Sequence, residues 1–290
     1  MRFYGTEIIR IGTAVVGGVE QPVAVHNDEA HSLGLPAGIT LIDAIASGSL
    51  SVAGVSPAPL PDSRLVAPVR PGKVVAIGLN YLDHIRETGL ERPKQPLVFA
   101  KFTTSVIGPD EPIEIDRRLT RRVDWEVELA VIIGRRMRRV PVHEALDHVF
   151  GYTVGNDISA RDLQFGDGQW TRGKSLDTFC PLGPAIVPAD AIPDPQALRL
   201  FTRVNGETVQ DSSTSEMIFG VAELLAFCSD AFTLEPGNVV MTGTPWGCGE
   251  FMDPKRGLND GDVVEAEVEG IGILRNPVVD VPADPILVER

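Results

Sequence analysis

The segment VDWEVELAVIIG, residues 123–134, has the side-chain pattern of a β-strand. Apolar Val, Trp and Leu residues alternate with Asp and Glu over its first half, so one face of the strand is acidic. Glu126 and Glu128 project from that face about 7 Å apart at Cα, close enough for both carboxylates to share one ion. A solvated sheet face would show the same alternation, so the pattern alone leaves both interpretations open.

Further strands are predicted on both sides of this segment. Within 198–213, LRLFTRVNGETVQDSS, two β-prone runs are joined by Asn205-Gly206, the preferred pair for a type I′ hairpin turn. The other strand-like segments are 7–16, 23–26, 73–79, 151–157, 238–247 and 262–279.

Helices are fewer and mostly short. Residues 41–47, LIDAIAS, predict one short helix, and residues 80–89 predict another that begins at an Asn80 cap and ends at Gly89. One long helix is expected within 216–232, where apolar residues recur at helical spacing. Because the strands outnumber the helices and do not alternate regularly with them, the sequence predicts an α+β fold with a large mixed or antiparallel sheet.

The chain has 290 residues, a length that suits either one large domain or two. Prolines are concentrated in residues 56–73, SPAPLPDSRLVAPVRPGK, where they oppose both helix interiors and central strands. We therefore predict a boundary there, between a small N-terminal domain of residues 1–70 and a larger domain of residues 71–290.

The charge balance restricts the partners of the protein. The chain has 26 Lys and Arg residues against 40 Asp and Glu residues, a formal net charge of −14. A field of that sign repels nucleic acid and anionic membrane surfaces, so neither is expected as a partner. A small anionic substrate would be repelled too, and its site must therefore contain local cations or a metal ion.

The cysteines and the N-terminal sequence give information on the cellular compartment of the protein. The three cysteines, Cys180, Cys228 and Cys248, are too few and too widely spaced for a disulfide framework or a CxxC site. The N-terminal residues do not form the basic, apolar and small-residue regions of a secretory signal. The longest uncharged run is rich in Ser, Gly and Pro and does not suit a membrane span. We expect a cytoplasmic protein.

The segment GQWTRGKS, residues 168–175, matches the phosphate-loop pattern GxxxxGK[ST] letter for letter. Its surroundings do not fit, because a phosphate loop leaves a buried strand and opens a helix, whereas Pro181, Gly183 and Pro184 follow soon after this one. Nucleotide binding is therefore disfavoured, and Lys174 is of interest as a fixed positive charge in an acidic protein.

Other side chains suggest a metal site and an acid–base pair. Asp157 follows a predicted strand, at a position where carboxylates often gather in sites. Together with Glu126 and Glu128 it would make an oxygen-only set, which favours Mg²⁺ or Mn²⁺ over Zn²⁺. His84 and Glu87 are three residues apart, so a helical turn puts them on one face, where the carboxylate can orient the imidazole.

Several segments together resemble the fumarylacetoacetate hydrolase family. They occur in the family's order and include GLNYLDHIRE at 78–87, PLVFAKF at 96–102, GYTVGNDISARDLQ at 151–164, QWTRGKSLDTFCPLGP at 169–184 and LEPGNVVMTGTPWG at 234–247. The resemblance covers residue 72 to the C-terminus, and the first seventy residues resemble the small N-terminal domain of bacterial two-domain members. It implies a mixed β-sandwich roll with a small β-rich N-terminal domain, usually assembled as a homodimer.

The resemblance also implies a role for individual residues. Glu126, Glu128 and Asp157 correspond to the carboxylate ligands of Mg²⁺ or Mn²⁺. The catalytic positions are His84 with Glu87, the pair that activates water beneath a mobile lid, and Lys174, which supports developing negative charge. The substrate-binding positions are Tyr81, Arg161, Gln164 and Thr244. Cys248 departs from the common pattern GTPxGVG, which leaves this loop's contacts with substrate open.

The activity implied is metal-dependent hydrolysis of a C–C bond in a 2,4-dioxo acid of the acylpyruvate type, through an enolate that the metal stabilises. Similar proteins use the same site as an oxaloacetate tautomerase or decarboxylase, or as a 2-hydroxyhepta-2,4-diene-1,7-dioate-type isomerase, which need no attacking water. The expected partner in each case is a small anionic 2-oxo or 2,4-dioxo acid. A metal-binding scaffold without catalysis is disfavoured, because His84, Glu87 and Lys174 make a complete catalytic set.

Overall fold

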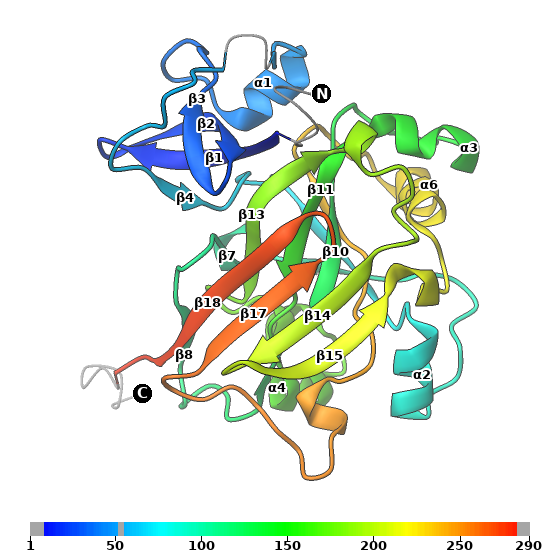
Figure 1. The fold of residues 1–290 in the computed structure, drawn as a ribbon. Coiled ribbons are helices and arrows are strands. Elements are labelled where there is room, and N and C mark those ends of the chain that lie inside the picture. Colours follow the sequence, from blue (N-terminus) through cyan, green and yellow to red (C-terminus); the bar gives the residue numbers. More distant parts are fainter. Residues whose placement is uncertain (1–8, 52–54, 283–290) are drawn as a thin grey trace.

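The computed structural model describes residues 9–51 and 55–282, which form two stacked β-sheets with helices at their margins (Figure 1). The larger sheet is mixed: the pair β16–β5 is parallel, whereas β10, β11 and β13 pair antiparallel. Its strands, in spatial order, are β3 (Glu29–Ser32), β2 (Val19–His26), β1 (Arg10–Val16), β13 (Cys180–Pro188), β11 (Val149–Asn156), β10 (Val127–Ile133), β16 (Val239–Met241), β5 (Val74–Gly78) and β6 (Leu97–Lys101), with β4 (Arg64–Val66) beside β1 and β7 (Val106–Ile107) beside β13.

A second sheet packs face to face on the first. Its strands, in order, are β15 (Glu207–Ser213), β14 (Arg199–Val204), β17 (Val263–Val268), β18 (Gly272–Asp280) and β8 (Ile113–Ile115). A short pair, β12 (Ser159–Ala160) with β9 (Val123–Asp124), lies apart from both sheets. Leu129 of β10 packs with Leu200 and Ala266 of the second sheet in one buried cluster, so the main core lies between the layers.

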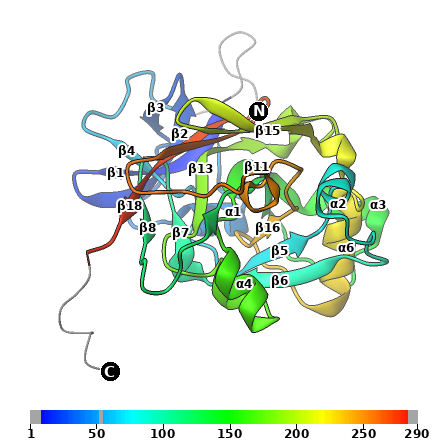
Figure 2. The ribbon, with the colours of Figure 1, turned by 90° about the horizontal axis from the view of Figure 1, so that it is seen from below.

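The helices are short and lie around the sheets. They are α1 (Leu41–Ser47), α2 (Leu82–Thr88), α3 (Val142–Ala145), α4 (Arg161–Asp167), α5 (Thr171–Lys174) and α6 (Val221–Ala231). Single turns of 3-10 helix are η2 (Thr103–Ser105), η3 (Leu146–His148), η4 (Ala189–Ala191), η5 (Thr214–Glu216) and η6 (Gly249–Phe251). Figures 1 and 2 place α2 and α4 at the end of the molecule opposite the N-terminal strands. Across the two described ranges, no helix is long and apolar enough to cross a membrane.

The predicted α+β roll is confirmed, and so is the hairpin between β14 and β15. Asn205 and Gly206 have φ angles of 53° and 81°, as a type I′ turn requires. The N-terminal strands continue the large sheet, since Ile11 of β1 pairs with Ile186 of β13. The division of the chain into residues 1–70 and 71–290 stays a prediction.

The prediction of one continuous strand over 123–134 is wrong. The chain leaves β9 after Asp124 and enters β10 at Val127, and the two strands pair with different partners. Side chains replace the strand bonds across the break: Asp124 Oδ1 accepts from the N–H of Trp125, and Asn156 Oδ1 accepts from the N–H of Glu126. The segment is also buried on both faces, so the interpretation as a solvated acidic face is excluded.

The predicted Asn80 cap is also wrong, although Gly89 does end the helix in a left-handed conformation. Tyr81 is the residue that precedes the first helical turn. The Asn80 amide instead donates to the carbonyls of Phe219 and Thr242, which fixes the entry to α2 against the loop after β16. These partners are far away in the sequence, so a local capping rule could not reveal them.

Candidate active site

Three buried carboxylates meet where β10 and β11 lie side by side. Glu128 is in β10, Glu126 occupies the break before it, and Asp157 directly follows β11. The N–H of Asp157 donates to the carbonyl of Glu126 at 2.8 Å, which holds the two residues together. One oxygen from each of the three side chains lies within 4.8 Å of the others. The grouping predicted from the sequence is therefore present.

Two lysines neutralise part of this cluster. Lys174 Nζ, at the end of α5, lies 2.7 Å from Glu126 Oε2 and 2.8 Å from Asp157 Oδ2. Burial lowers the pKa of Lys174, but Asp157 and Glu126 outweigh it and the pKa is raised, so the ammonium keeps its charge. Lys101 Nζ, at the end of β6, lies 2.5 Å from Asp157 Oδ1 and also donates to the carbonyl of Lys174.

Glu128 has no such partner among the described side chains, and its Oε2 accepts only the N–H of Gly243, at 2.7 Å. Burial, followed by repulsion from Asp157 and Glu126, raises the pKa of Glu128 well above its usual range. The pKa of Glu126 is lowered to about 2, because Lys174 and Arg161 outweigh the effect of burial. The cluster thus contains one carboxyl group, that of Glu128, whose ionised form the neighbouring cations do not balance.

These residues fit a divalent cation. The donors are all carboxylate oxygens, which suits Mg²⁺ or Mn²⁺ better than a softer metal. A cation among them would also balance the charge that makes ionised Glu128 unfavourable.

His84 and Glu87 form the predicted pair on one face of α2. His84 Nδ1 is 2.9 Å from Glu87 Oε2, and the second carboxylate oxygen of Glu87 accepts the N–H of Gly247 at 2.8 Å. The imidazole also packs edge to face against Phe251, with ring centroids 5.5 Å apart. A carboxylate on one side and an aromatic ring on the other therefore fix the orientation of the imidazole.

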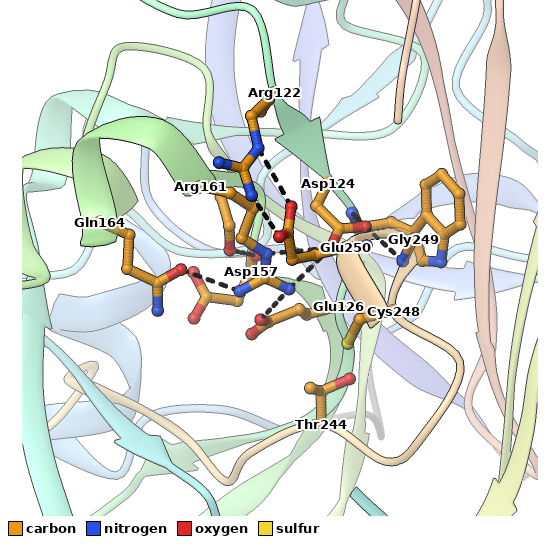
Figure 3. Close-up of polar contacts among 12 residues, drawn as sticks. Arg122, Asp124, Glu126, Asp157, Arg161, Gln164, Thr244, Cys248, Gly249 and Glu250 are labelled. Atoms are coloured by element: carbon orange, nitrogen blue, oxygen red, sulfur yellow. Dashed lines mark hydrogen bonds and ion pairs between the residues drawn. The ribbon is translucent and has the colours of Figure 1, made fainter. Parts of the chain in front are cut away.

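Arg161, the first residue of α4, links the carboxylate cluster to a further acid. Its Nη2 lies 2.7 Å from Glu126 Oε1, its Nε donates to Asp124 Oδ2 at 2.9 Å, and its Nη1 donates to Gln164 Oε1 at 2.9 Å (Figure 3). The guanidinium is buried and lies over the ring of Phe251. Its charge is shared between Asp124 and Glu126.

A cavity of 60 Å³ opens beside the carboxylates and brings most of the predicted residues together. The predicted residues that line it are His84, Glu126, Arg161, Gln164, Lys174 and Thr244. Apolar side chains complete the wall, among them Phe99, Trp170 and Phe251. Tyr81 does not line the cavity, because it is fully buried in the main core. Its predicted contact with substrate stays a prediction.

The segment 168–175 is not built like a phosphate loop. Gly168 ends α4 with a φ of 69°, and α5 has only four residues. Lys174 points onto the carboxylates rather than into a ring of backbone N–H groups. The disfavoured nucleotide interpretation therefore finds no support in the local structure.

Three buried residues of the site were not assigned from the sequence: Lys101, Asp124 and Gln210. Asp124 belongs to the acidic alternation of residues 123–134, but this pattern did not indicate what its side chain contacts. Gln210 donates to Thr244 Oγ1 at 3.0 Å and accepts the N–H of Val127 at 3.0 Å, so it joins the loop after β16 to the start of β10. Nothing in its local sequence indicates this contact.

Comparison with known proteins identifies the family. The family model for the fumarylacetoacetate (FAA) hydrolase C-terminal region matches residues 73–279. The mitochondrial oxaloacetate tautomerase fahd2 of Xenopus laevis is 47% identical over 218 residues, which are 74% of this chain and 68% of that protein.

Two solved structures are similar over almost the whole chain. A fumarylacetoacetate hydrolase from Exiguobacterium antarcticum is 39% identical with a TM-score of 0.86, over 94% of this chain and 100% of the other. A 2-hydroxyhepta-2,4-diene-1,7-dioate isomerase from Mycobacterium marinum is 37% identical with a TM-score of 0.79, over 94% and 98%.

Proposed function

Because this chain belongs to the fumarylacetoacetate hydrolase family of enzymes, we propose that it interconverts the keto and enol forms of oxaloacetate or a closely related 2-oxo acid, with the help of a divalent metal ion. The observation that carries the proposal is the position of His84, an oriented proton carrier that lines the same cavity as Glu126 and Lys174. The oxaloacetate tautomerase of Xenopus laevis, at 47% identity, supports the choice of substrate.

In this proposal Glu126, Glu128 and Asp157 hold the metal ion. When bound, a divalent ion polarises the 2-oxo group and so makes the adjacent C–H bond more acidic. The substrate carboxylate would lie against Arg161 and the amide of Gln164, which also line the cavity. Lys174 adds positive charge near the oxygen on which negative charge develops.

His84 moves the proton. An ionised carboxylate can only accept, so in the neutral imidazole the Nδ1 that faces Glu87 Oε2 carries the hydrogen and Nε2 has the free lone pair. In the direction from keto to enol, Nε2 takes a proton from C3 of the substrate, and a proton is returned to the carbonyl oxygen. Glu87 stabilises the imidazolium formed between the two transfers.

The test is the loss of enol absorbance of oxaloacetate with Mg²⁺ or Mn²⁺, compared with the same protein after chelation. We expect metal-dependent turnover that falls at least about 100-fold in His84→Ala, the usual range for a general acid–base residue. The metal affinity of that variant, measured by calorimetry, should stay close to wild type. Undiminished turnover by His84→Ala would remove the role proposed for this residue.

Hydrolysis of an acylpyruvate-type substrate is the second candidate. It is favoured by the similarity to the hydrolase from Exiguobacterium antarcticum, and the imidazole that takes a proton from carbon could take one from water instead. The reactions differ in the fate of solvent oxygen. Incorporation of ¹⁸O from labelled water into a carboxylate product, tested over a panel of 2,4-dioxo acids, would identify hydrolysis.

A further inference from the structure

Cys248 lies beside the His84 and Glu87 pair, and the proposed reaction does not use it. One ligand atom from each of His84, Glu87 and Cys248 lies within 4.8 Å of the others. They come from two separate parts of the chain, α2 and the loop after β16. We propose that these three residues form a second metal site, selective for Zn²⁺, whose occupation blocks the imidazole and inhibits the enzyme.

The donor set differs in kind from that of the carboxylate cluster. A thiol, an imidazole and one carboxylate are typical zinc ligands, and three protein ligands with one open position are a common zinc arrangement. Sulfur and nitrogen donors discriminate against Mg²⁺, which prefers oxygen. The two clusters would therefore bind different metals, although one residue of each, Glu126 and His84, lines the same cavity.

Cys248 is fully buried, and the carboxylate of Glu87 beside it supplies negative charge that favours a bound cation. The only described polar contacts of the Cys248 thiol are long ones, 3.9 Å to the carbonyl of Pro245 and 4.0 Å to Gln210 Nε2. Zinc would displace the thiol proton to solvent and add a Zn–S bond.

His84 is the residue of this group that lines the cavity beside the carboxylates, so its imidazole is the ligand that an entering metal ion would meet first. Zinc bound to the imidazole would occupy a nitrogen that the proton transfer needs. It would also compete for Glu87, whose carboxylate orients the ring. Inhibition should therefore act on turnover and leave the Mg²⁺ ligands in place.

The test uses Co²⁺ as a spectroscopic substitute for Zn²⁺, added to the whole chain in saturating Mg²⁺. Wild type should show a near-ultraviolet thiolate-to-cobalt charge-transfer band that added Zn²⁺ abolishes. Cys248→Ala should lack the band. Cys228→Ala is the matched control: Cys228 is buried in α6 and belongs to no such ligand group among the described residues, so its loss should leave the band unchanged.

A second measurement follows the inhibition. The Zn²⁺ concentration that halves turnover should rise at least about tenfold in Cys248→Ala, since even indirect partners of a metal contribute that much to affinity. Turnover of this variant without Zn²⁺ should equal that of wild type. The proposal is overturned if wild type shows no thiolate band, if the band persists in Cys248→Ala, or if Zn²⁺ inhibits both proteins equally. The cobalt spectrum is measured without turnover, so its result does not depend on whether the proposed reaction is correct.

Discussion

Asp124 joins the two halves of the site. Its Oδ2 accepts from Arg161, which contacts Glu126, and from the N–H of Glu250 at 3.0 Å. Its Oδ1 accepts the N–H of Gly249 at 2.8 Å (Figure 3). The same stretch of chain continues to Phe251, whose ring packs on His84. One buried carboxylate therefore sets the position of the Arg161 guanidinium and of the loop beside the His84 imidazole.

We predict that Asp124→Asn destabilises the protein by about 2 kcal/mol, because the buried guanidinium of Arg161 loses one of its two anionic partners and keeps only Glu126. Turnover should fall with a raised KM, since Arg161 is then free to shift. Urea unfolding and steady-state kinetics measure the two effects. The control is Asp116→Asn, which removes an ion pair with Arg118 at the surface and should cost less than about 1 kcal/mol. Equal losses in both variants would contradict the role given to Asp124.

Glu250 provides a prediction about acid stability. Burial raises the pKa of this side chain, but hydrogen bonds from Arg122 and Lys255 outweigh it and the pKa is lowered. A lowered pKa in the folded state contributes stability above the ordinary value of 4.5, and this contribution is lost as the pH falls through the folded value. Wild type should thus lose more stability than Glu250→Gln between neutral pH and the range below 4.5. Denaturant midpoints at several pH values test this, and parallel curves for the two proteins would contradict it.

At the scale of an element, two glycines with positive φ distinguish two costs of adding a Cβ atom: strain in the backbone and collision with neighbouring atoms. Gly206 has a φ of 81° in the hairpin turn and open space where a Cβ would lie. Gly247 has a φ of 96° in the loop after β16, where a Cβ would collide with the carbonyl of Val209. We predict that Gly206→Ala costs about 1 kcal/mol and leaves activity unchanged.

Gly247→Ala should cost more and should also reduce turnover. Its backbone must shift, and its N–H is the donor that holds Glu87 Oε1. Thermal unfolding and kinetics on both variants measure the difference. If Gly247→Ala loses no more stability and turnover than Gly206→Ala, the loop after β16 can shift to accommodate the Cβ atom, contrary to this prediction.

Elements whose signals are local could be predicted from the sequence. The hairpin at Asn205-Gly206 and the His84–Glu87 pair depend on neighbours within a few residues, and both are present. The break after Asp124 and the role of Lys101 depend on partners far along the chain. Lys101 and Asp157, for example, are 56 residues apart. No local pattern contains that information.

At the scale of the molecule, an acidic chain places positive charge where a substrate anion would bind. The formal net charge is −14, yet Lys101, Lys174 and Arg161 are all buried around one group of carboxylates. A surface of this sign does not attract anions over long range. In the proposed reaction, binding of an anionic substrate would therefore depend on these short-range cations and on the metal ion. The homodimer that the resemblance implies stays a prediction.

This charge arrangement predicts how metal ions affect the stability of the whole fold. A ligand that binds only the folded state stabilises it by about 2.7 kcal/mol at 100 times its Kd. The melting temperature should therefore rise with added Mg²⁺ or Mn²⁺ and fall again on chelation. The exposed side chain of Glu114 offers a control, because Glu114→Gln should leave this rise unchanged.

Glu128→Gln should change stability in opposite directions without and with metal, relative to wild type. The variant removes the carboxylate that burial and two neighbouring charges make unfavourable, so without metal it should be at least as stable as wild type. It also removes a proposed ligand, so the metal-dependent rise in melting temperature should shrink or vanish. Calorimetry in chelator and in saturating metal gives both values for each protein. If the melting temperature of Glu128→Gln rises with metal as much as that of wild type, the cation binds elsewhere. If Glu128→Gln is less stable than wild type in chelator, the Glu128 carboxyl does not destabilise the metal-free protein.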